Sequence, residues 1–462
     1  MNTKLLSLLL ALLLCICILA GCAPAKTPVA AQPTETAEEV TLTISGSWPD
    51  CRAIDNAANA FTALYPNCTV VYEYGQDYYT SLEKRMTGDD PVDLFITTNI
   101  QADSPLLPYA LELNGREDLD LSQTFDGLIQ NFAFYGETSG GKPLLYAVPL
   151  GAEMRGLYVN VTLLKSLGLE VPTDQASLLA ACKTLKENGY IPFHGNPGSF
   201  AQLLLYPWIA NLIANAGDPQ ATYNQVNKRE PGLSELFRAP FEFLYSLVEN
   251  GYYDYKKAQT DENLFTDARD EAYARDFLNI RPKEGEDGVF EKADDLGLVA
   301  FMPSPMSMQQ TVNKTKEDYH SAIEYVFIPA PVGPEGGYVY LSPAHGIAVG
   351  KNGAHVDWSV KFLNFLYQPA NNEAFAKAFN IVPNTKEAFA YIKNMFNVPD
   401  NRIAQLGQVT FDYAFYNIVT ESLMNVSKGN NPKYMQDDGS GNLSLYPLSH
   451  YLEGLEVSIA EQ

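Results

Sequence analysis

Aromatic and polar side chains follow the short apolar runs in the N-terminal part of this 462-residue chain. The residues at these positions are Trp48, Asp50, Tyr78 and Asn99. The flat face of an aromatic ring packs against the C–H side of a sugar ring, and carboxylates or amides bind sugar hydroxyls in fixed directions. If these side chains come together, the chemistry that they offer is the binding of a polar, sugar-like solute.

A second group of aromatic and polar residues lies farther along the chain. Its members are Glu153, Tyr206, Trp208, Ser304 and His345. The sequence leaves a structural alternative open for each kind of residue in both groups. A tryptophan can belong to the core or cover the end of a strand, a glutamate can be solvated, and an isolated polar residue often caps a turn. We predict that the two groups together bind the ligand.

Catalytic motifs are weak in this sequence. Ser81-Leu82-Glu83-Lys84 has the Ser-x-x-Lys spacing of penicillin-interacting enzymes, but the Ser-Asp-Asn and Lys-Thr-Gly partner motifs are absent. Asp89-Asp90 and Asp294-Asp295 have the residue types of a glycosidase pair, but adjacent carboxylates are more typical of solvated loops. We therefore predict a protein that is not an enzyme, and we keep a surface enzyme that acts on polysaccharide as an alternative.

Downstream of Cys22 the chain has three cysteines, Cys51, Cys68 and Cys182. Cys51 and Cys68 flank a helical pattern that would separate them by about 20 Å at ~1.5 Å per residue, beyond the reach of a disulfide. We therefore expect three free thiols. The five histidines lack the spacing of a helical zinc site, so we expect no metal and no other cofactor.

The formal net charge of the chain is −24, and no basic run interrupts this acidic balance. A partner that binds through phosphates would be repelled, which excludes nucleic acid and an anionic bilayer surface as binding partners. Hydrophobic residues make up 46% of the chain, so it can bury a core large enough for two or more lobes.

The pattern of apolar residues predicts a parallel sheet near the N-terminus. The runs with the composition of strands are residues 40–45, 69–74 and 92–97. Residues 55–65 have one apolar helical face, and a second short helix precedes the third strand. Strand, helix, strand, helix, strand is typical of a parallel sheet with helices on both faces. Trp358 lies at helical spacing with Phe362 and Phe365, and we predict it as a core residue.

The N-terminal segment resembles the signal peptide of bacterial lipoproteins. A lysine precedes the apolar residues 5–20, and Leu19-Ala20-Gly21-Cys22 places a cysteine where such signals are cut and acylated. The resemblance implies a signal peptide over residues 1–21, a lipid on Cys22 and a tether over residues 22–39. The mature protein would then lie on the outer face of the cytoplasmic membrane. An ordinary secretory signal is the alternative.

Two blocks of the chain resemble the extracellular solute-binding proteins (family 1) of carbohydrate ABC transporters. The segments that carry the resemblance, in the family's order and spacing, are Gly141-Lys142, Tyr146-Ala147-Val148-Pro149, Gly156-Leu157-Tyr158-Val159-Asn160, Tyr325-Val326-Phe327-Ile328-Pro329, Gly336-Gly337-Tyr338 and Ser342-Pro343-Ala344-His345-Gly346-Ile347-Ala348. The chain departs from the family at Val161, where a lysine is common. It also has Met302-Pro303-Ser304-Pro305 where the family usually has Gly-Ser-Trp, which argues against a ligand-facing aromatic residue there.

The resemblance implies an α/β, two-lobed periplasmic-binding-protein-like fold (type II) with the ligand cleft between the lobes. The expected lobes are residues 40–150 with 332–375 for lobe 1, and residues 151–331 with 376–462 for lobe 2. The chain would cross between them near residues 148–152 and return near residues 327–331. The C-terminal helices would pack back on the second lobe.

The function that the resemblance implies is the capture of a sugar or oligosaccharide for an ABC importer. A ligand that bridges the lobes would shift the protein toward a closed form, which a separate permease would recognise. The expected partners are the carbohydrate, the permease subunits and the membrane through Cys22, and we expect a monomer. In this family a helix like the one predicted over residues 208–216 faces the ligand, so we expect Trp208→Ala to weaken binding and leave the fold intact. A sensor module that presents the same ligand to a receptor is a further alternative.

Overall fold

The computed structural model describes residues 38–47, 51–75, 78–97, 100, 104–124, 128–129, 132–133, 144–195, 197–219, 221–222, 225, 233–253, 267–399, 402–405, 435–437 and 443–460. Residues 40–462 form one compact unit that contains two main sheets. In the part of the chain described, no helix is long and apolar enough to cross a membrane.

The first sheet has five strands in the order β2-β1-β3-β12-β4. Their bounds are β1 (Val40–Gly46), β2 (Cys68–Tyr74), β3 (Leu94–Thr97), β4 (Val148–Pro149) and β12 (Gly346–Val349). β1 pairs in parallel with β2 and with β3, which confirms the predicted parallel sheet. β12 comes from much later in the chain and pairs antiparallel with β3 and β4. We call this sheet and the helices packed on it the first lobe.

The first lobe buries one face of each helix against its sheet. Its helices are α2 (Arg52–Leu64), α3 (Tyr78–Met86), α13 (Val356–Leu366) and α14 (Pro369–Phe379), with the short turn η1 (Leu107–Tyr109). α2 buries Phe61, whose ring packs edge-on against Phe362 at 5.2 Å between centroids. Trp358 is half-buried and packs edge-on against Phe61 at 6.3 Å, so it lies against the first-lobe core as predicted.

The second sheet has six strands around the central strand β5 (Ala152–Asn160). The others are β6 (Ile191–Phe193), β9 (Val299–Pro305), β10 (Tyr325–Pro329), β11 (Val339–Pro343) and β13 (Ile403–Gln405). β5 pairs antiparallel with β9. It also pairs antiparallel with β11 over residues 152–154 and with β10 over residues 156–160. A Cβ atom on Gly156 would lie 2.4 Å from the carbonyl oxygen of Ile328, so β5 and β10 approach each other closely only because this residue is glycine. We call this sheet and its helices the second lobe.

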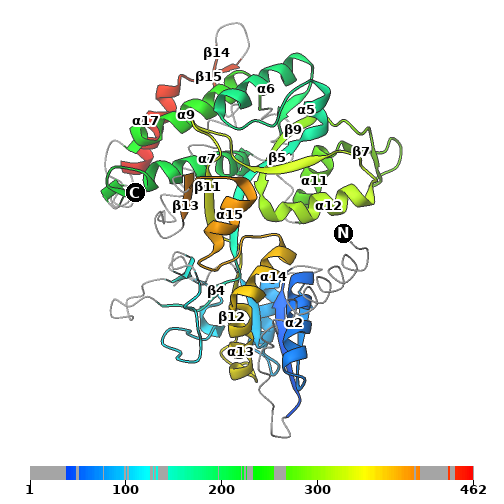
Figure 1. The fold of residues 1–462 in the computed structure, drawn as a ribbon, viewed down its shortest axis with the longest axis vertical. Helices are drawn as coiled ribbons and strands as arrows, with labels where there is room; N and C mark the ends of the chain where they lie inside the picture. The colour runs from blue at the N-terminus through cyan, green and yellow to red at the C-terminus, as the bar shows by residue number, and fades with distance from the viewer. Residues whose placement is uncertain are drawn as a thin grey trace, which may run out of the picture. The chain divides into compact units, whose positions relative to one another are not determined.

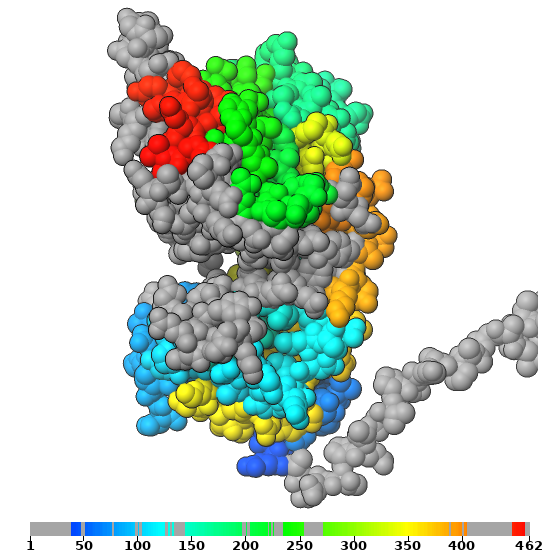
Figure 2. Space-filling view, turned by 90° about the vertical axis from the view of Figure 1, so that its left-hand side faces the viewer, coloured from blue at the N-terminus to red at the C-terminus, as the bar shows by residue number. Residues whose placement is uncertain are grey.

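The helices of the second lobe include the last helix of the chain. They are α5 (Val161–Ser166), α6 (Gln175–Glu187), α7 (Pro197–Ala214), α9 (Leu233–Glu249), α11 (Asp267–Phe277), α12 (Gln309–Asp318), α15 (Ala388–Phe396) and α17 (Leu448–Ala460), with the turn η4 (Met306–Met308). α17 lies beside α9, where the red and green surfaces meet in Figure 2, and Glu456 Oε1 accepts the Ser234 N–H at 2.7 Å. The last helix therefore packs on the second lobe as predicted.

Two small antiparallel pairs lie outside the main sheets. They are β7 (Ile280–Pro282) with β8 (Phe290–Lys292), and β14 (Met435–Asp437) with β15 (Leu443–Leu445). Figure 1 shows both pairs in the upper half of the view, together with the strands and helices of the second lobe. Neither pair belongs to the segments that join the two main sheets.

The helix predicted to begin at Trp208 begins earlier. α7 starts at Pro197, and Pro207 lies inside the helix. The prediction was wrong because proline is favoured in the first turn of a helix, and Pro197 rather than Pro207 holds that position. Asn211 Nδ2 donates to the Pro207 carbonyl at 2.7 Å, so this carbonyl has a side-chain partner within the helix.

The chain returns to the first lobe later than the sequence predicts. β11 falls in the segment assigned to lobe 1, but it pairs with β5 and β13 of the second sheet. The last crossing is also later than residue 375, because Phe379 and Ile381 belong to the first-lobe core, whereas Val382 packs with Ala152 and β11. The change of sheet is hidden in the sequence because β11 and β12 are both apolar strands separated by only Ala344 and His345.

Cys51, Cys68 and Cys182 are buried and free. Burial raises the pKa of the Cys68 thiol to about 11 and also raises the pKa of the Cys182 thiol. Both thiols are therefore protonated at neutral pH and act as small apolar side chains.

Candidate functional site

Three described segments join the two lobes, and backbone hydrogen bonds tie them to one another. They are residues 150–152, 343–346 and 381–384, and we call them the crossing segments. Leu150 N donates to the His345 carbonyl at 2.7 Å, and the Ala152 and Val382 N–H groups each donate to the other residue's carbonyl at 2.8 Å. A Cβ atom on Gly151 would lie 2.5 Å from Ile381 Cδ1, so glycine is needed where the segments pack together.

Buried amide side chains fix the first crossing segment. Asn384 Nδ2 donates to the Pro149 carbonyl at 2.9 Å, and Asn372 Nδ2 donates to the Leu150 carbonyl at 3.3 Å. Asn372 Oδ1 in turn accepts the Asn384 N–H at 2.7 Å, and the Tyr367 hydroxyl donates to Pro149. These contacts satisfy backbone carbonyls at the end of β4 and directly after it. The crossing segments therefore form a defined connection rather than loose linkers.

Glu153 begins the second lobe directly after the first crossing segment. Its side chain is half-buried, and Oε1 accepts the Ser307 N–H at 3.2 Å. Burial raises the pKa of this carboxyl to about 7, although the hydrogen bonds from Ser307 and the charge of Arg155 lower it. Near neutral pH, Glu153 can therefore both donate and accept a hydrogen bond, which suits a hydroxyl-bearing ligand.

Arg155 follows two positions along the same strand, so its side chain lies on the same face as that of Glu153. The guanidinium carbon lies 5.5 Å from the centre of the Tyr206 ring and 5.8 Å from that of Tyr340. The two rings are stacked with 6.4 Å between their centroids. Sequence reasoning missed Arg155, because one of its aromatic partners comes from α7 and the other from β11, and no local pattern predicts this contact.

His345 and Ser304 lie close to the crossing segments. His345 is in the second crossing segment, half-buried, and its ring packs edge-on against Phe379 at 5.9 Å. Burial lowers the pKa of His345 to about 4, so its imidazole is neutral at physiological pH. Ser304 is buried on β9 opposite Gly156 of β5. A role for either side chain in ligand binding stays a prediction.

Tyr78 and Tyr206 have little exposed surface. The Tyr78 hydroxyl donates to the Ser45 carbonyl at 3.1 Å and to the Ile96 carbonyl, so Tyr78 holds the ends of β1 and β3 together. Burial raises the pKa of this hydroxyl far above its ordinary value. Tyr206 is fully buried beside Tyr340. Tyr79, next to Tyr78, is 55% exposed and is an aromatic surface that the sequence analysis did not select.

Trp208 is 4% exposed and belongs to the second-lobe core. Its ring centroid lies 6.3 Å from that of Phe243. A Cβ atom on Gly333 would lie 2.9 Å from the indole, so the chain around Gly333 covers the Trp208 ring. A stacking role for Trp208 stays a prediction, but the ring also has a clear packing role. The remaining predicted residues are Trp48, Asp50, Asn99 and the predicted lipid-attachment residue Cys22, and all four lie outside the described residues.

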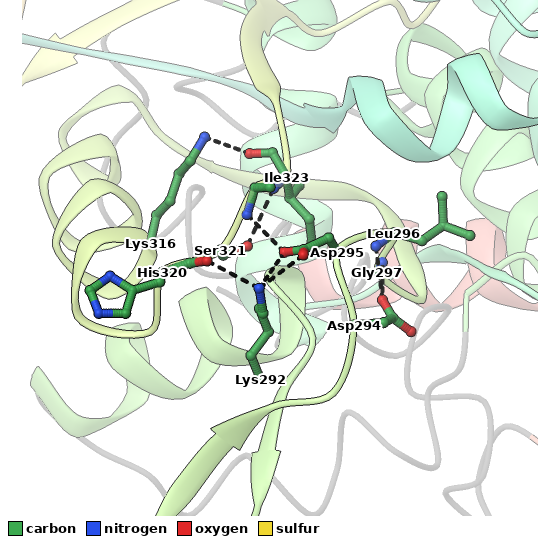
Figure 3. A network of polar contacts seen from close by, with 10 residues as sticks. Lys292, Asp294, Asp295, Leu296, Gly297, Lys316, His320, Ser321 and Ile323 are labelled. Atoms are coloured by element: carbon green, nitrogen blue, oxygen red, sulfur yellow. Dashed lines mark hydrogen bonds and ion pairs between the residues drawn. The ribbon is translucent and has the colours of Figure 1, made fainter.

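Asp294 and Asp295, one of the two carboxylate pairs considered for a glycosidase, stabilise turns. Asp294 Oδ1 accepts the N–H groups of Leu296 at 2.9 Å and Gly297 at 2.8 Å, as Figure 3 shows. Asp295 binds Lys292 Nζ at 2.8 Å and also accepts the Ala322 N–H at 2.8 Å. The hydrogen bonds lower the pKa of Asp295, so the carboxylate stays ionised in its structural role. Across the described ranges, no group of three His, Cys, Asp or Glu side chains is placed to hold a metal.

A further polar cluster lies where β6 ends. His194 Nε2 lies 2.8 Å from Asp276 Oδ2, and the other oxygen of Asp276 pairs with Arg281. His194 is buried, whereas Asp276 is partly exposed. Phe193 at the end of β6 pairs with Phe301 of β9, which pairs with Val159 of β5, so this cluster lies toward the end of β5 that is remote from the crossing segments. Its members come from β6, α11 and β7, and the sequence offered no spacing that would have joined them.

Comparisons with known proteins agree with this architecture. The family model described as "Bacterial extracellular solute-binding protein" matches residues 46–373. No curated protein matches the chain. A family 1 extracellular solute-binding protein from Bifidobacterium longum subsp. infantis is 15% identical with a TM-score of 0.55, and the match covers 92% of this chain and 100% of that one.

Two sugar complexes are similar in fold. RafE with raffinose, a protein whose apo form is known from Streptococcus pneumoniae, is 15% identical over 91% of this chain and 99% of its own, with a TM-score of 0.56. Maltose-bound MalE3 of T. maritima is 15% identical over 91% and 99%, with a TM-score of 0.57. At this identity the structures support the fold, and the match of the family model over most of the chain identifies the family. The chain belongs to the bacterial extracellular solute-binding proteins and has their two-lobed fold.

Proposed function

We propose that this protein is a lipid-anchored receptor that captures a sugar or oligosaccharide between its lobes and delivers it to an ABC permease. The family match over residues 46–373 carries this proposal. Two lobes joined by short, hydrogen-bonded crossing segments can rotate about them as units, and a ligand that contacts both lobes favours their approach. The protein would therefore report a bound ligand by its conformation.

The sugar class is supported by the relatives and by the side chains near the crossing segments. Proteins with the same fold form complexes with raffinose, stachyose and maltose. Glu153 and Arg155 place an acceptor and a fixed donor on one face of β5. The proposed ligand-binding residues remain Trp48, Asp50, Tyr78, Asn99, Glu153, Tyr206, Trp208, Ser304 and His345, to which we add Arg155.

The strand pairing supports a revised division of the chain into lobes. We propose that the first lobe contains residues 40–150 and 344–381, and that the second contains residues 151–343 and 382–460. The family consists of binding proteins, and we propose that this chain has no catalytic activity. A monomer that meets separate permease subunits at the membrane is the simplest arrangement for such a receptor.

Thermal unfolding with candidate ligands tests the proposed function. Residues 23–462, which contain the whole compact unit, would be heated with maltose, raffinose, stachyose and their monosaccharides. A ligand at one hundred times its Kd stabilises the native state by about 2.7 kcal/mol, so a true ligand gives a saturable rise in Tm. Each hit would be checked for cleaved product. Product would support the enzyme alternative, and a panel without any stabilisation would contradict the sugar class.

The lipid anchor needs a separate test in cells. Incorporation of labelled fatty acid into the full-length chain is expected, together with recovery of the protein in the membrane fraction. Cys22→Ser removes the only thiol at the predicted cleavage position and should abolish the label. A labelled Cys22→Ser protein, or an unlabelled protein of the original sequence, would contradict the anchor without affecting the proposed binding function.

A further inference from the structure

The two lobes also meet outside the crossing segments, where α14 ends against η4 and the start of α12. Asn380 follows α14 in the left-handed conformation, with φ of 58°, and its Nδ2 donates to the Met306 carbonyl of η4 at 2.6 Å. Gln310 Nε2 of α12 donates to the Ala378 carbonyl in the last turn of α14 at 3.1 Å. Figure 1 shows α14 in the first lobe and α12 in the second. We call these two hydrogen bonds the seam.

In the second lobe, hydrogen bonds with β5 fix the turn η4, which accepts the Asn380 amide. The Met306 carbonyl that receives Asn380 also accepts the Tyr158 hydroxyl at 2.8 Å. The next residue, Ser307, donates its N–H to Glu153. Tyr158 and Glu153 both belong to β5, the strand that also carries Arg155. The seam is therefore connected through η4 to the strand that we propose contacts the ligand.

In the first lobe, the seam is formed by the C-terminal end of α14. The last carbonyls of an α-helix have no partner within the helix, so the Ala378 carbonyl is available to Gln310. Phe379 packs its ring against His345 of the second crossing segment. Val382, two residues after Asn380, pairs with Ala152. A rotation of one lobe relative to the other would thus have to strain or break the hydrogen bonds of the seam.

We infer that Asn380 and Gln310 are positioning residues that set ligand affinity by restricting the relative orientations of the two lobes. This inference rests on the proposed function, because it concerns binding between the lobes. A ligand that rotates the lobes toward each other has to break these hydrogen bonds, so the seam favours the orientation described here and lowers the affinity for the ligand. Neither residue needs to touch the ligand for this effect.

The test replaces Asn380 with glycine and uses Asn397→Gly as its control. Asn397 ends α15 in the same left-handed conformation, with φ of 52°, and its exposed side chain lies on the second lobe. Glycine tolerates this backbone conformation at both positions, so each variant removes an amide side chain without adding strain. A second variant, Gln310→Ala, removes the other seam hydrogen bond from an exposed position.

Two readouts separate the inference from the proposed function. The first is the distribution of distances between spin labels on the lobes, at Asp90→Cys and Lys183→Cys, in residues 23–462 without any sugar. The native cysteines downstream of Cys22 are buried, so labelling is selective for the exposed new thiols. The second readout is the affinity for whichever oligosaccharide the thermal screen identifies, compared with the Tm of each variant.

The expected result is a broader distance distribution and a Kd about threefold to tenfold tighter for Asn380→Gly, because closure no longer has to break one net hydrogen bond. Gln310→Ala should change both readouts in the same direction, and Asn397→Gly should change neither. The Tm of Asn380→Gly should match that of Asn397→Gly. An unchanged distribution, or weaker binding by Asn380→Gly, would overturn the inference. If no sugar binds, the proposed ligand class fails, but the distance distributions still decide whether the seam restricts the lobes.

Discussion

The two lobes are built from similar layers of helix and sheet, but they are assembled differently. In the first lobe, β1, α2, β2, α3 and β3 follow one another along the chain, and β1 pairs with both of the next strands. In the second lobe, β5 pairs with β9, β10 and β11, which come much later in the chain. Local sequence therefore determines much of the first lobe, whereas the second depends on packing around one central strand.

This difference predicts where each lobe tolerates change. A strand that is paired on both sides by distant segments cannot move without disturbing several elements at once. An outer layer made of neighbouring elements can shift more easily. Matched substitutions in the two lobes should therefore cost more in the second lobe than in the first, and the following experiments measure that difference.

The largest difference in the free energy of unfolding is expected between alanine variants of the two described tryptophans. Trp208 is 4% exposed, so Trp208→Ala should leave a cavity and lower the free energy of unfolding by about 3 to 5 kcal/mol. Trp358 is half-buried at the edge of the first-lobe core, so Trp358→Ala should cost about 1 to 2 kcal/mol. Urea denaturation measures both. The burial contradicts our sequence-based expectation that Trp208→Ala leaves the fold intact.

Ligand titration then separates packing from binding at Trp208. A loss of affinity of about tenfold with an unchanged urea midpoint would restore the role predicted from the sequence. Equal destabilisation by the two tryptophan variants would instead contradict the contrast between the lobes.

Two glycines, one in each lobe, allow a more direct comparison of how each lobe tolerates an added methyl group. A Cβ atom on Gly156 meets the Ile328 backbone carbonyl at 2.4 Å, whereas one on Gly46 meets the end of the Tyr72 side chain at 2.4 Å. A side chain can rotate away, but a paired strand cannot. Gly156→Ala should therefore cost about 3 kcal/mol, and Gly46→Ala less than about 1 kcal/mol. Hydrogen exchange of the β5 and β1 amides would show whether each loss stays in its own lobe; similar losses in both lobes would refute the prediction.

The sequence predicted the first sheet well because its information is local. Residues 40–45, 69–74 and 92–97 have strand composition, and helical patterns lie between them, so the order of elements implies the pairing. The second sheet was not predictable strand by strand, since β11 and β12 differ in their sheet but not in their composition. The contact of Arg155 with Tyr206 and Tyr340 depends on that topology. Glu153 and His345 were selected because they lie near the crossings that the resemblance implies, and their role in ligand binding stays a prediction.

Glu153, next to the first crossing segment, and His345, in the second, should give opposite pH dependences of stability. Burial raises the pKa of Glu153 from its ordinary 4.5 to about 7, so the native state holds a proton that the unfolded chain releases. Stability contributed by this group is therefore full below pH 4.5 and is lost as the pH rises to about 7. Burial lowers the pKa of His345 from 6.5 to about 4, so its contribution is full above pH 6.5 and is lost as the pH falls toward 4.

Single variants separate the two groups. At pH 8, Glu153→Gln should be more stable than the original protein by on the order of 2 kcal/mol, because glutamine does not ionise. At pH 4 this advantage should disappear. His345→Gln should flatten the dependence between pH 4 and pH 6.5. Urea midpoints measured from pH 4 to pH 8 give both slopes. A Glu153→Gln protein with the pH profile of the original chain would show that the Glu153 carboxyl titrates normally.

The smallest expected effects come from cations that lie on aromatic rings in each lobe. Lys361 Nζ lies 4.2 Å from the centre of the Tyr65 ring on the exposed side of the first lobe, and its removal by Lys361→Met should cost about 0.5 kcal/mol. Arg155 lies beside two buried rings, where water screens the interaction less, so Arg155→Met should cost about 1 to 2 kcal/mol. Denaturation in low and high salt distinguishes the two, because only the exposed pair should respond strongly. If Lys361→Met costs as much as Arg155→Met, the difference in burial between these two sites does not control their strength.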